Sequence, residues 1–474
     1  MSGSQYSMLY KGSIRLRTFT ARAAFCALFL IAWIPLAFAQ EPPLDVPLRR
    51  LSTKDPTATA VGDWLLYPTL RVYSVYSDNL FLSPTSPISV PGFGITPGLT
   101  AVRTDGIHTT TLFANIDRQV YPTDADINTI DGHAGFTQRY EALRDLIFTV
   151  NGNYTHQTLS SSLQNSIQTG IATPTAVPTP PPNGTPPGQP TGQPTGQTNP
   201  ATGSNLPLIV SPSNSYTGAF SVEKIFNRGM LNLTGTVSRT DYENQSSQGT
   251  LQNTNSRTFS ESAGFWLGPL FYAYSNGSIG TVVTDATSAS TTSYRVIGGL
   301  GTRQFGLFRG SAYFGHQGSQ SGGGGGGGGG AGGDVYGGSL SYYPTLRWTL
   351  TGTLDKTTNI SSPGSVTNLA LTLPTLAPVQ IALGTSTHIT NAGLQSTYEI
   401  TPSWFASLQL NYTRIEYIAS PRLDNAWVLD ATLRYDIWHN MSLTWEYRYR
   451  SILSNAPFAS AISNYGSMGA TYKF

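Results

Sequence analysis

The sequence predicts an all-β protein, a closed antiparallel transmembrane β-barrel of about 18 strands, and three observations support this fold class. The first is an apolar leader at the N-terminus. The second is the alternation of apolar and polar residues over many segments of about ten residues. The third is that the connections between these segments are alternately short and long. Counts from 16 to 20 strands remain open, because the segments near 270–282 and 335–343 alternate weakly.

Residues 1–39 have the features of a cleaved signal peptide. Four basic residues and no acid precede "AAFCALFLIAWIPLAFA", an uncharged run of 17 residues that ends at Ala39. The small residues Ala37 and Ala39 suit a signal peptidase. A retained membrane anchor is the alternative, but a run of this length that contains Pro35 is at the short limit for a transmembrane helix. We therefore expect export and cleavage.

The remaining chain, residues 40–474, has a composition that limits its class. The only cysteine, Cys26, lies in the leader, so neither a disulfide nor a thiolate metal site is expected. Removal of four basic residues leaves 27 − 4 = 23 Lys and Arg against 25 Asp and Glu. This balance argues against nucleic acid as a partner. No run of 18 apolar residues follows residue 40, so no transmembrane helix is expected.

The alternation is clearest near the C-terminus. In "MSLTWEYRYR", residues 441–450, Trp445 and Tyr447 fall on one face, and Glu446 and Arg448 fall on the other. A face made of Thr, Asn and charged residues suits a wet lumen and not a packed core. On this basis we expect strands near 65–77, 93–103, 107–120, 127–140, 146–157, 214–226, 230–243, 254–267, 270–282, 291–303, 308–317, 335–343, 347–358, 386–399, 403–417, 425–437, 441–452 and 462–474.

The connections predict the domain organisation. If the first strand rises from the periplasm, every second connection is a short periplasmic turn, such as "NRG" at 227–229. The others are extracellular, and the three longest span 158–213, 318–334 and 359–385. We expect residues 40–64 to form a periplasmic tail and residues 65–474 to form the barrel. The Pro-rich segment 173–200 and the poly-Gly segment 321–333 read as flexible loops, since neither matches a nucleotide-binding motif.

The stretch "LLYPTLRVYSVYSDNLF", residues 65–81, resembles the opening of the bacterial β-barrel porin 2 type. Tyr67-Pro68 matches an aromatic-Pro strand, and Asp78-Asn79-Leu80-Phe81 matches an acid-Asn-aliphatic-Phe turn. The segment "GITPGLTAV", residues 94–102, is similar to the second strand of that family. The resemblance implies a barrel in the outer membrane. Some members of the family are associated with exopolysaccharide export.

Charged residues on the expected inward faces are candidates for a pore lining. A charge that faces lipid near the bilayer midplane costs a few kcal/mol, so these side chains are expected to face the lumen. There they would bias passage toward certain solutes, or they would form ion pairs that only stabilise the interior. The candidates are Arg295, Arg303, Arg309, Asp355, Glu399, Asp430, Arg434, Asp436, Glu446, Arg448, Arg450 and Lys473.

Aromatic residues on the outward faces are expected to form interfacial girdles. They are Trp404, Trp427, Trp445, Tyr447, Tyr449 and Tyr472. A sugar-binding platform is the alternative for this group. The last residue, Phe474, resembles the terminal aromatic signal by which the barrel-assembly machinery recognises its clients.

These features together predict a passive channel in the outer membrane of a Gram-negative bacterium. It would pass small hydrophilic solutes or ions, with outer-membrane lipid and lipopolysaccharide as its surroundings. A non-conducting accessory barrel for polysaccharide export or surface display is the alternative. No enzyme activity and no cofactor are expected, because no nucleophile–base cluster or metal-ligand spacing stands out.

Overall fold

The computed structural model describes residues 58–80, 82–84, 87–123, 127–158, 212–243, 253–285, 290–322, 332–359, 387–418, 420–456 and 459–474. The chain divides into two compact units, Met1–Gln40 and Glu41–Phe474. The expected signal peptide lies outside the described residues. So do most of the expected tail, the Pro-rich segment and most of the poly-Gly segment. All of the described residues belong to the second unit.

Its secondary structure consists of β-strands. The strands are β1 (Thr59–Val61), β2 (Trp64–Ser77), β3 (Val90–Thr104), β4 (His108–Val120), β5 (Thr129–Leu143), β6 (Leu146–Gln157), β7 (Ser213–Phe226), β8 (Gly229–Tyr242), β9 (Thr254–Trp266), β10 (Phe271–Thr284), β11 (Ser290–Thr302), β12 (Phe308–Gly322), β13 (Gly332–Thr345), β14 (Trp348–Asn359), β15 (Thr387–Thr401), β16 (Trp404–Tyr417), β17 (Leu423–Trp438), β18 (Met441–Ser454) and β19 (Ala461–Lys473). Within the described ranges, no helix is long and apolar enough to cross a membrane.

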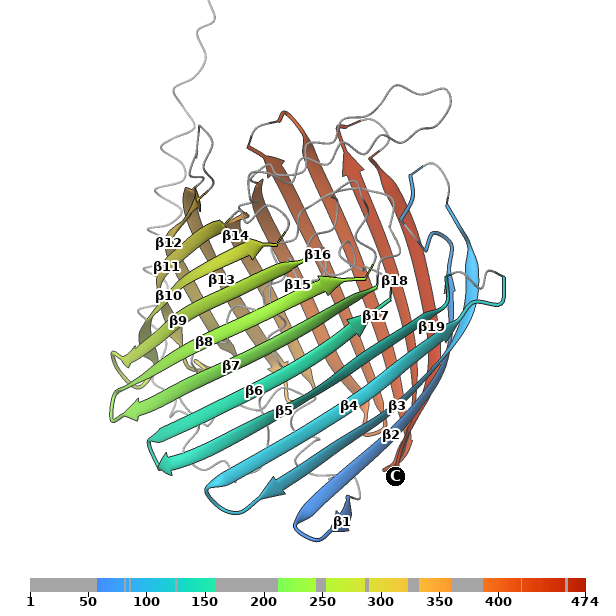
Figure 1. Ribbon diagram of the computed structural model, residues 1–474, viewed down its shortest axis with the longest axis horizontal. Helices are drawn as coiled ribbons and strands as arrows, with labels where there is room; N and C mark the ends of the chain where they lie inside the picture. The colour runs from blue at the N-terminus through green and yellow to red at the C-terminus, as the bar shows by residue number, and fades with distance from the viewer. Residues whose placement is uncertain are drawn as a thin grey trace, which may run out of the picture. The chain divides into compact units, whose positions relative to one another are not determined.

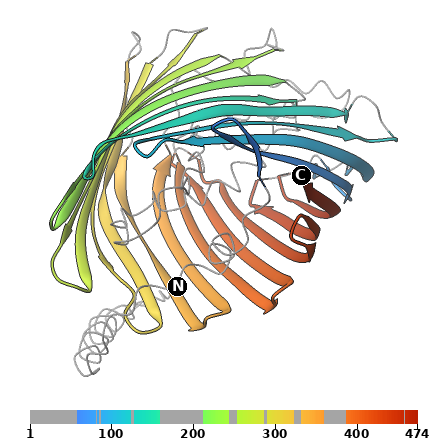
Figure 2. The ribbon, with the colours of Figure 1, turned by 90° about the horizontal axis from the view of Figure 1, so that it is seen from below.

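Strands β2 to β19 form one closed antiparallel sheet of 18 strands, as predicted. Each strand pairs with its neighbour in the chain, and the strands run side by side with a common tilt (Figure 1). Figure 2 shows the sheet curling round so that the red C-terminal strand meets the blue N-terminal one. There β19 pairs with β2 from Lys473 opposite Thr69 to Tyr465 opposite Ser77. Closure leaves no row of unpaired backbone groups along either strand.

Short and long connections alternate around the barrel. From the strand bounds, eight connections have two to five residues, and the other nine have five to 55. We call the two rims the short-turn end and the long-loop end. Phe474 lies at the short-turn end, where its N–H donates to the carbonyl of Pro68 at 3.0 Å. The alternation agrees with the 18 strands located from periodicity.

Two expected boundaries were wrong. The loop expected at 318–334 is shorter, because β12 continues to Gly322 and β13 starts at Gly332, with Gly318 paired to Gly332. Glycines add no side-chain alternation, although their backbone groups can still pair, so periodicity could not detect these strand ends. The expected tail at 40–64 contains β1, which forms a hairpin with β2 around Gly62. Gly62 has a φ of +60°, a conformation that favours glycine.

The pairing registers sort the side chains into an outer and an inner face, because directly opposed residues point the same way. The outer face is apolar and exposed, with Phe93, Ile95, Phe136, Phe220, Val237, Phe259, Leu340, Leu354, Leu394 and Leu408 among its residues. The inner face is polar. On β8 and β9 it includes Asn232, Thr234, Thr236, Ser238, Thr240, Thr254, Ser256, Thr258, Ser260 and Ser262.

Candidate functional site

All twelve charged residues singled out from the sequence lie on the inner face, or in register with it just beyond a strand end. They are Arg295, Arg303, Arg309, Asp355, Glu399, Asp430, Arg434, Asp436, Glu446, Arg448, Arg450 and Lys473. Sheet closure brings the C-terminal members of this set next to β2. The structure thus places a charged wall on β17, β18, β19 and β2.

An ion pair crosses the seam where the barrel closes. The Arg71 guanidinium on β2 lies 3.2 Å from Glu446 Oε1 on β18, so the pair spans β19. Ser467 on β19 donates its hydroxyl to Glu446 Oε2 at 3.0 Å. Gly469 lies beside Arg71 and has no side chain to obstruct it. The first, last and next-to-last strands are therefore joined through one carboxylate.

The same wall contains paired and unpaired cations. Arg448 donates to Asp430, its direct neighbour on β17. Arg434 donates to Asp436 at 2.7 Å. Arg450 forms no ion pair with any residue the structure describes, although it shares the inner face with Arg448. An inner-face cation without a bound carboxylate can attract an anion inside the barrel.

A second group of inner-face charges lies across β11 to β14. Tyr313 donates its hydroxyl to Asp355, and the Arg295 guanidinium lies 3.4 Å from the same hydroxyl. Tyr313 reaches Asp355 because Gly337 stands between them on β13. Arg295 Nε and Asp355 Oδ2 have no hydrogen-bond partner within the described structure. Near the short-turn end, Arg303 stacks 4.0 Å from the ring centroid of Trp266.

The sequence analysis did not identify a pair of opposed acidic residues on β4 and β5. Asp117 and Asp131 oppose each other on the inner face. Asp117 accepts hydrogen bonds from the Tyr73 hydroxyl at 2.7 Å, Thr96 at 2.7 Å and Gln119 at 2.9 Å, all of them neutral donors. Two carboxylates opposed in this way repel each other. Other inner-face charges that were not singled out are Arg71, Arg139, Glu141, Glu223 and Asp424.

Two connections at the long-loop end pack on the inner side of the wall. Tyr121 and Ile127, which flank the β4–β5 connection, form a buried cluster with Tyr73, Val75 and Val90. Burial raises the pKa of the Tyr121 phenol to about 12. These contacts narrow the space inside the barrel next to the seam.

The β2–β3 connection also turns inward. Its Leu82 reaches past β19 and packs against Ala426, Val428 and Ile452 on β17 and β18. Leu82 has a φ of +51°, which is uncommon for a residue with a side chain. The two inward connections therefore lie on both sides of the seam.

The aromatic residues singled out from the sequence lie on the outer face. They are Trp404, Trp427, Trp445, Tyr447, Tyr449 and Tyr472. Several form stacked contacts near the short-turn end, including Trp404 with Tyr435 at 4.5 Å and Trp404 with Trp445 at 6.0 Å. Tyr472 packs edge-on against Phe474 at 4.7 Å.

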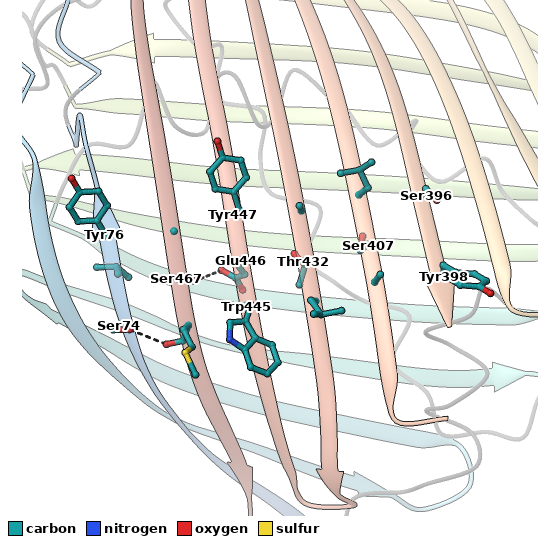
Figure 3. Close-up of a pocket in the computed structure, with 17 residues that line it drawn as sticks. Ser74, Tyr76, Ser396, Tyr398, Ser407, Thr432, Trp445, Glu446, Tyr447 and Ser467 are labelled. Carbon is teal, nitrogen blue, oxygen red and sulfur yellow. Dashed lines mark hydrogen bonds between the residues drawn. The ribbon is translucent and has the colours of Figure 1, made fainter. Parts of the chain in front are cut away.

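An apolar groove of about 700 Å³ crosses the outer face beside the seam. Figure 3 shows four aromatic side chains around it: Tyr398 on β15, Trp445 and Tyr447 on β18, and Tyr76 on β2. The small residues Ala406, Ala431 and Gly466 lie between these rings and leave the wall thin there. The groove contains no cluster of groups that could perform acid–base chemistry.

In the ranges that the structure covers, no group of three or more His, Cys, Asp and Glu residues is arranged to hold a metal ion. His156, His316 and His388 lie on the outer face near the long-loop end. His156 contacts Asn214 and Glu243, His316 contacts Asp334, and His388 contacts Thr358.

No family model matches the chain, and no curated protein matches it. The resemblance to the β-barrel porin 2 type is therefore unconfirmed. Among solved structures, OpdL of Pseudomonas aeruginosa is 12% identical, with a TM-score of 0.44 over 87% of this chain and 99% of its own. OccAB2 of Acinetobacter baumannii is 11% identical, with 0.45 over 87% and 99%. The FrpB iron transporter of Neisseria meningitidis is 9% identical, with 0.44 over 91% and 83%. Such low similarity is no evidence for a shared solute.

Proposed function

We propose that this protein is an outer-membrane channel that passes small hydrophilic solutes or ions by passive diffusion. The observation that carries the proposal is the division of the sheet into a mainly apolar outer face and a mainly polar, charged inner face. A closed antiparallel barrel with that division satisfies its backbone groups internally and presents a mainly apolar surface to lipid. Barrels of 16 to 18 strands are wide enough for an aqueous channel.

The depth of the apolar band supports a membrane location. On β16, Trp404 belongs to the aromatic cluster at the short-turn end, and Tyr412 packs at a tilt against Trp427, with ring centroids 4.6 Å apart, toward the long-loop end. At roughly 3.3 Å per residue and a tilt of roughly 40°, these two rings are about 20 Å apart in depth. This is close to the height of the apolar band in outer-membrane barrels. The short-turn end would face the periplasm, and the long-loop end would face outward.

The lumen would have mixed charge. On β18, Arg448 and Arg450 lie on the inner face with Asp430 and Glu446 nearby. On β4 and β5, Asp117 and Asp131 form an acidic pair on the same face. Charges of both signs on one lining bias passage by the charge of the solute. Phe474 would serve as the recognition signal for the barrel-assembly machinery.

A second candidate, a barrel with a restricted or closed lumen, is favoured by the inward packing of Leu82 and Ile127. Such a barrel would serve polymer export or surface display. Conductance of the refolded protein in a planar bilayer separates the two candidates. A conducting wild type supports the channel. If conductance appears only after deletion of residues 158–213, a loop closes the resting lumen.

A further inference from the structure

Several cations lie on the outer face close to the long-loop end. Each stands two or three residues inside the end of its strand: Arg118 on β4, Arg239 on β8, Arg257 on β9, Lys356 on β14 and Arg414 on β16. In a barrel oriented as proposed above, this depth is the outer-leaflet interface. Headgroups there would meet the cations that the chain leaves without an acid. Arg239 instead contacts Asp241 at 2.8 Å and Asp285 at 3.3 Å.

Lys356 and Arg414 lie in one row across three strands. Lys356 opposes Thr390 on β15, and Thr390 opposes Arg414 on β16. Neighbouring strands are about 4.8 Å apart, so the two cations flank Thr390 with their backbones roughly 10 Å apart. Both side chains are long and flexible enough to converge on one anion between them. The Thr390 hydroxyl, which makes no hydrogen bond within the described ranges, adds a donor at the centre.

The local contacts leave this row available to a ligand. Lys356 Nζ lies 5.6 Å from the ring centroid of Tyr336 and forms no ion pair with the residues that the structure describes. Arg414 contacts Glu416 at 2.7 Å, with both side chains nearly half exposed. One such contact uses only part of the five donors of a guanidinium. The other acid on this part of the face, Asp334, contacts His316 at 3.3 Å.

The surface below the row is apolar. Leu354, Ala392 and Tyr412 form the next row toward the short-turn end, followed by Gly352, Leu394 and Leu410. Ala392 and Gly352 leave shallow positions between exposed leucines, which suit acyl chains. Hydrogen-bond donors at the long-loop end and an apolar strip toward the short-turn end suit a phosphorylated lipid beside the barrel. The donors would meet its phosphate, and the strip would meet its acyl chains.

At the short-turn end, Lys224 and Arg103 differ from Lys356 because each has an acid partner in the chain. Lys224 contacts Asp145 at 2.5 Å, and this hydrogen bond lowers the pKa of the Asp145 carboxyl. Arg103 lies 3.5 Å from Asp63. Both acids belong to the short connections of the chain itself. No acid of the described chain neutralises Lys356 in this way, so its counter-charge would have to come from the surroundings.

We propose that Lys356, Thr390 and Arg414 bind a phosphate group of lipid A in the outer leaflet. The two cations and the hydroxyl hold the phosphate, and the strip on β14 to β16 receives the acyl chains. Charge-assisted hydrogen bonds of Lys and Arg to phosphate are about twice as strong as neutral ones. The site rests on the membrane location and orientation proposed above. It does not require that the lumen conducts.

The test is a titration of the folded protein in neutral detergent with bis-phosphorylated lipid A, measured by native mass spectrometry. Each cation near an anionic surface contributes roughly fivefold in affinity, so Lys356→Gln with Arg414→Gln should weaken binding roughly 25-fold. Arg103→Gln with Lys224→Gln is the matched control, because it removes two outward cations at the opposite rim. Heat-modifiable gel mobility checks that each variant is folded.

Two results would overturn the site. One is equal binding of lipid A and its dephosphorylated form. The other is an equal loss of affinity in the control variant. Equal, residue-dependent binding of phosphatidylglycerol would also exclude lipid A as the specific ligand. Wild-type conductance separates this claim from the channel. A folded barrel that prefers phosphorylated lipid A but does not conduct refutes the channel alone, whereas a conducting barrel without that preference refutes the site alone.

Discussion

Three hydrogen bonds between Asp78, which follows β2, and Asn464 on β19 join the two strands that close the barrel. The Asp78 N–H donates to the Asn464 carbonyl at 3.1 Å. In return, the Asn464 N–H and its side-chain amide donate to the two carboxylate oxygens of Asp78, each at 2.7 Å. Asn79 continues the link, because its amide donates to the carbonyl of Ile462 at 3.0 Å. The turn that follows the first long strand therefore fastens the last strand at the seam.

Asp78→Ala should lower the free energy of unfolding by about 2 kcal/mol. It removes two hydrogen bonds to a charged acceptor, which contribute about 1.5–3 kcal/mol each when buried and less at an exposed rim. Asp63→Ala is the control, since Asp63 is 79% exposed and lies 3.5 Å from Arg103. Its effect should stay below about 1 kcal/mol. The measurement is the urea midpoint in micelles, and equal shifts in the two variants would contradict the role of Asp78 at the seam.

Glu446→Gln should shift ion selectivity toward anions. The change leaves Arg71 on the inner face without its carboxylate partner. Glu416→Gln is the matched control, because it removes a carboxylate from an arginine on the outer face. The reversal potential under a KCl gradient measures both variants. Only Glu446→Gln should move it, and a similar shift with Glu416→Gln would mean that the potential does not report the lumen.

Tyr73→Phe should destabilise the barrel by about 1–2 kcal/mol. The hydroxyl of Tyr73 donates to both oxygens of Asp117, and the tyrosine is only 6% exposed. Removal of that donor leaves a partly buried carboxylate with fewer hydrogen bonds. Tyr76→Phe changes an outward, 53% exposed tyrosine on the same strand and should be nearly neutral. Thermal unfolding in micelles compares them, and no difference would argue against a structural role for the Tyr73–Asp117 bond.

Deletion of Phe474 should harm assembly far more than deletion of residues 323–331, which connect β12 and β13. Phe474 extends the seam by a backbone hydrogen bond to Pro68 and packs on Tyr472. Its loss removes both contacts and the terminal aromatic residue. The fraction of heat-modifiable protein in isolated outer membranes measures assembly. If the loop deletion reduces that fraction as much as the loss of Phe474, the terminal residue has no special role.

The strands and their faces could be predicted from the sequence because a half-exposed strand has a period of two. The segment 441–450 shows this well, and the registers of β17 and β18 place Glu446 and Arg448 on the predicted inner face. Which residues come into contact where the barrel closes could not be predicted. Arg71 and Glu446 are 375 positions apart, and only closure of the sheet brings them together.

The missed residues have a common cause. Asp117 was not singled out because its donors Tyr73 and Thr96 come from other strands, and the one donor in its own segment, Gln119, is uncharged. The Asp78-Asn79 pair was noted only through a family resemblance. Its contact with Asn464 spans 386 positions, so neither period nor spacing could reveal its role at the seam.

Single-channel recording of the wild-type protein in a planar bilayer tests the central claim most directly. We expect discrete, ohmic conductance steps in KCl, with a reversal potential that Glu446→Gln moves toward anion selectivity. A preparation that is folded by heat-modifiable mobility and conducts in neither polarity would contradict the channel and leave only the barrel.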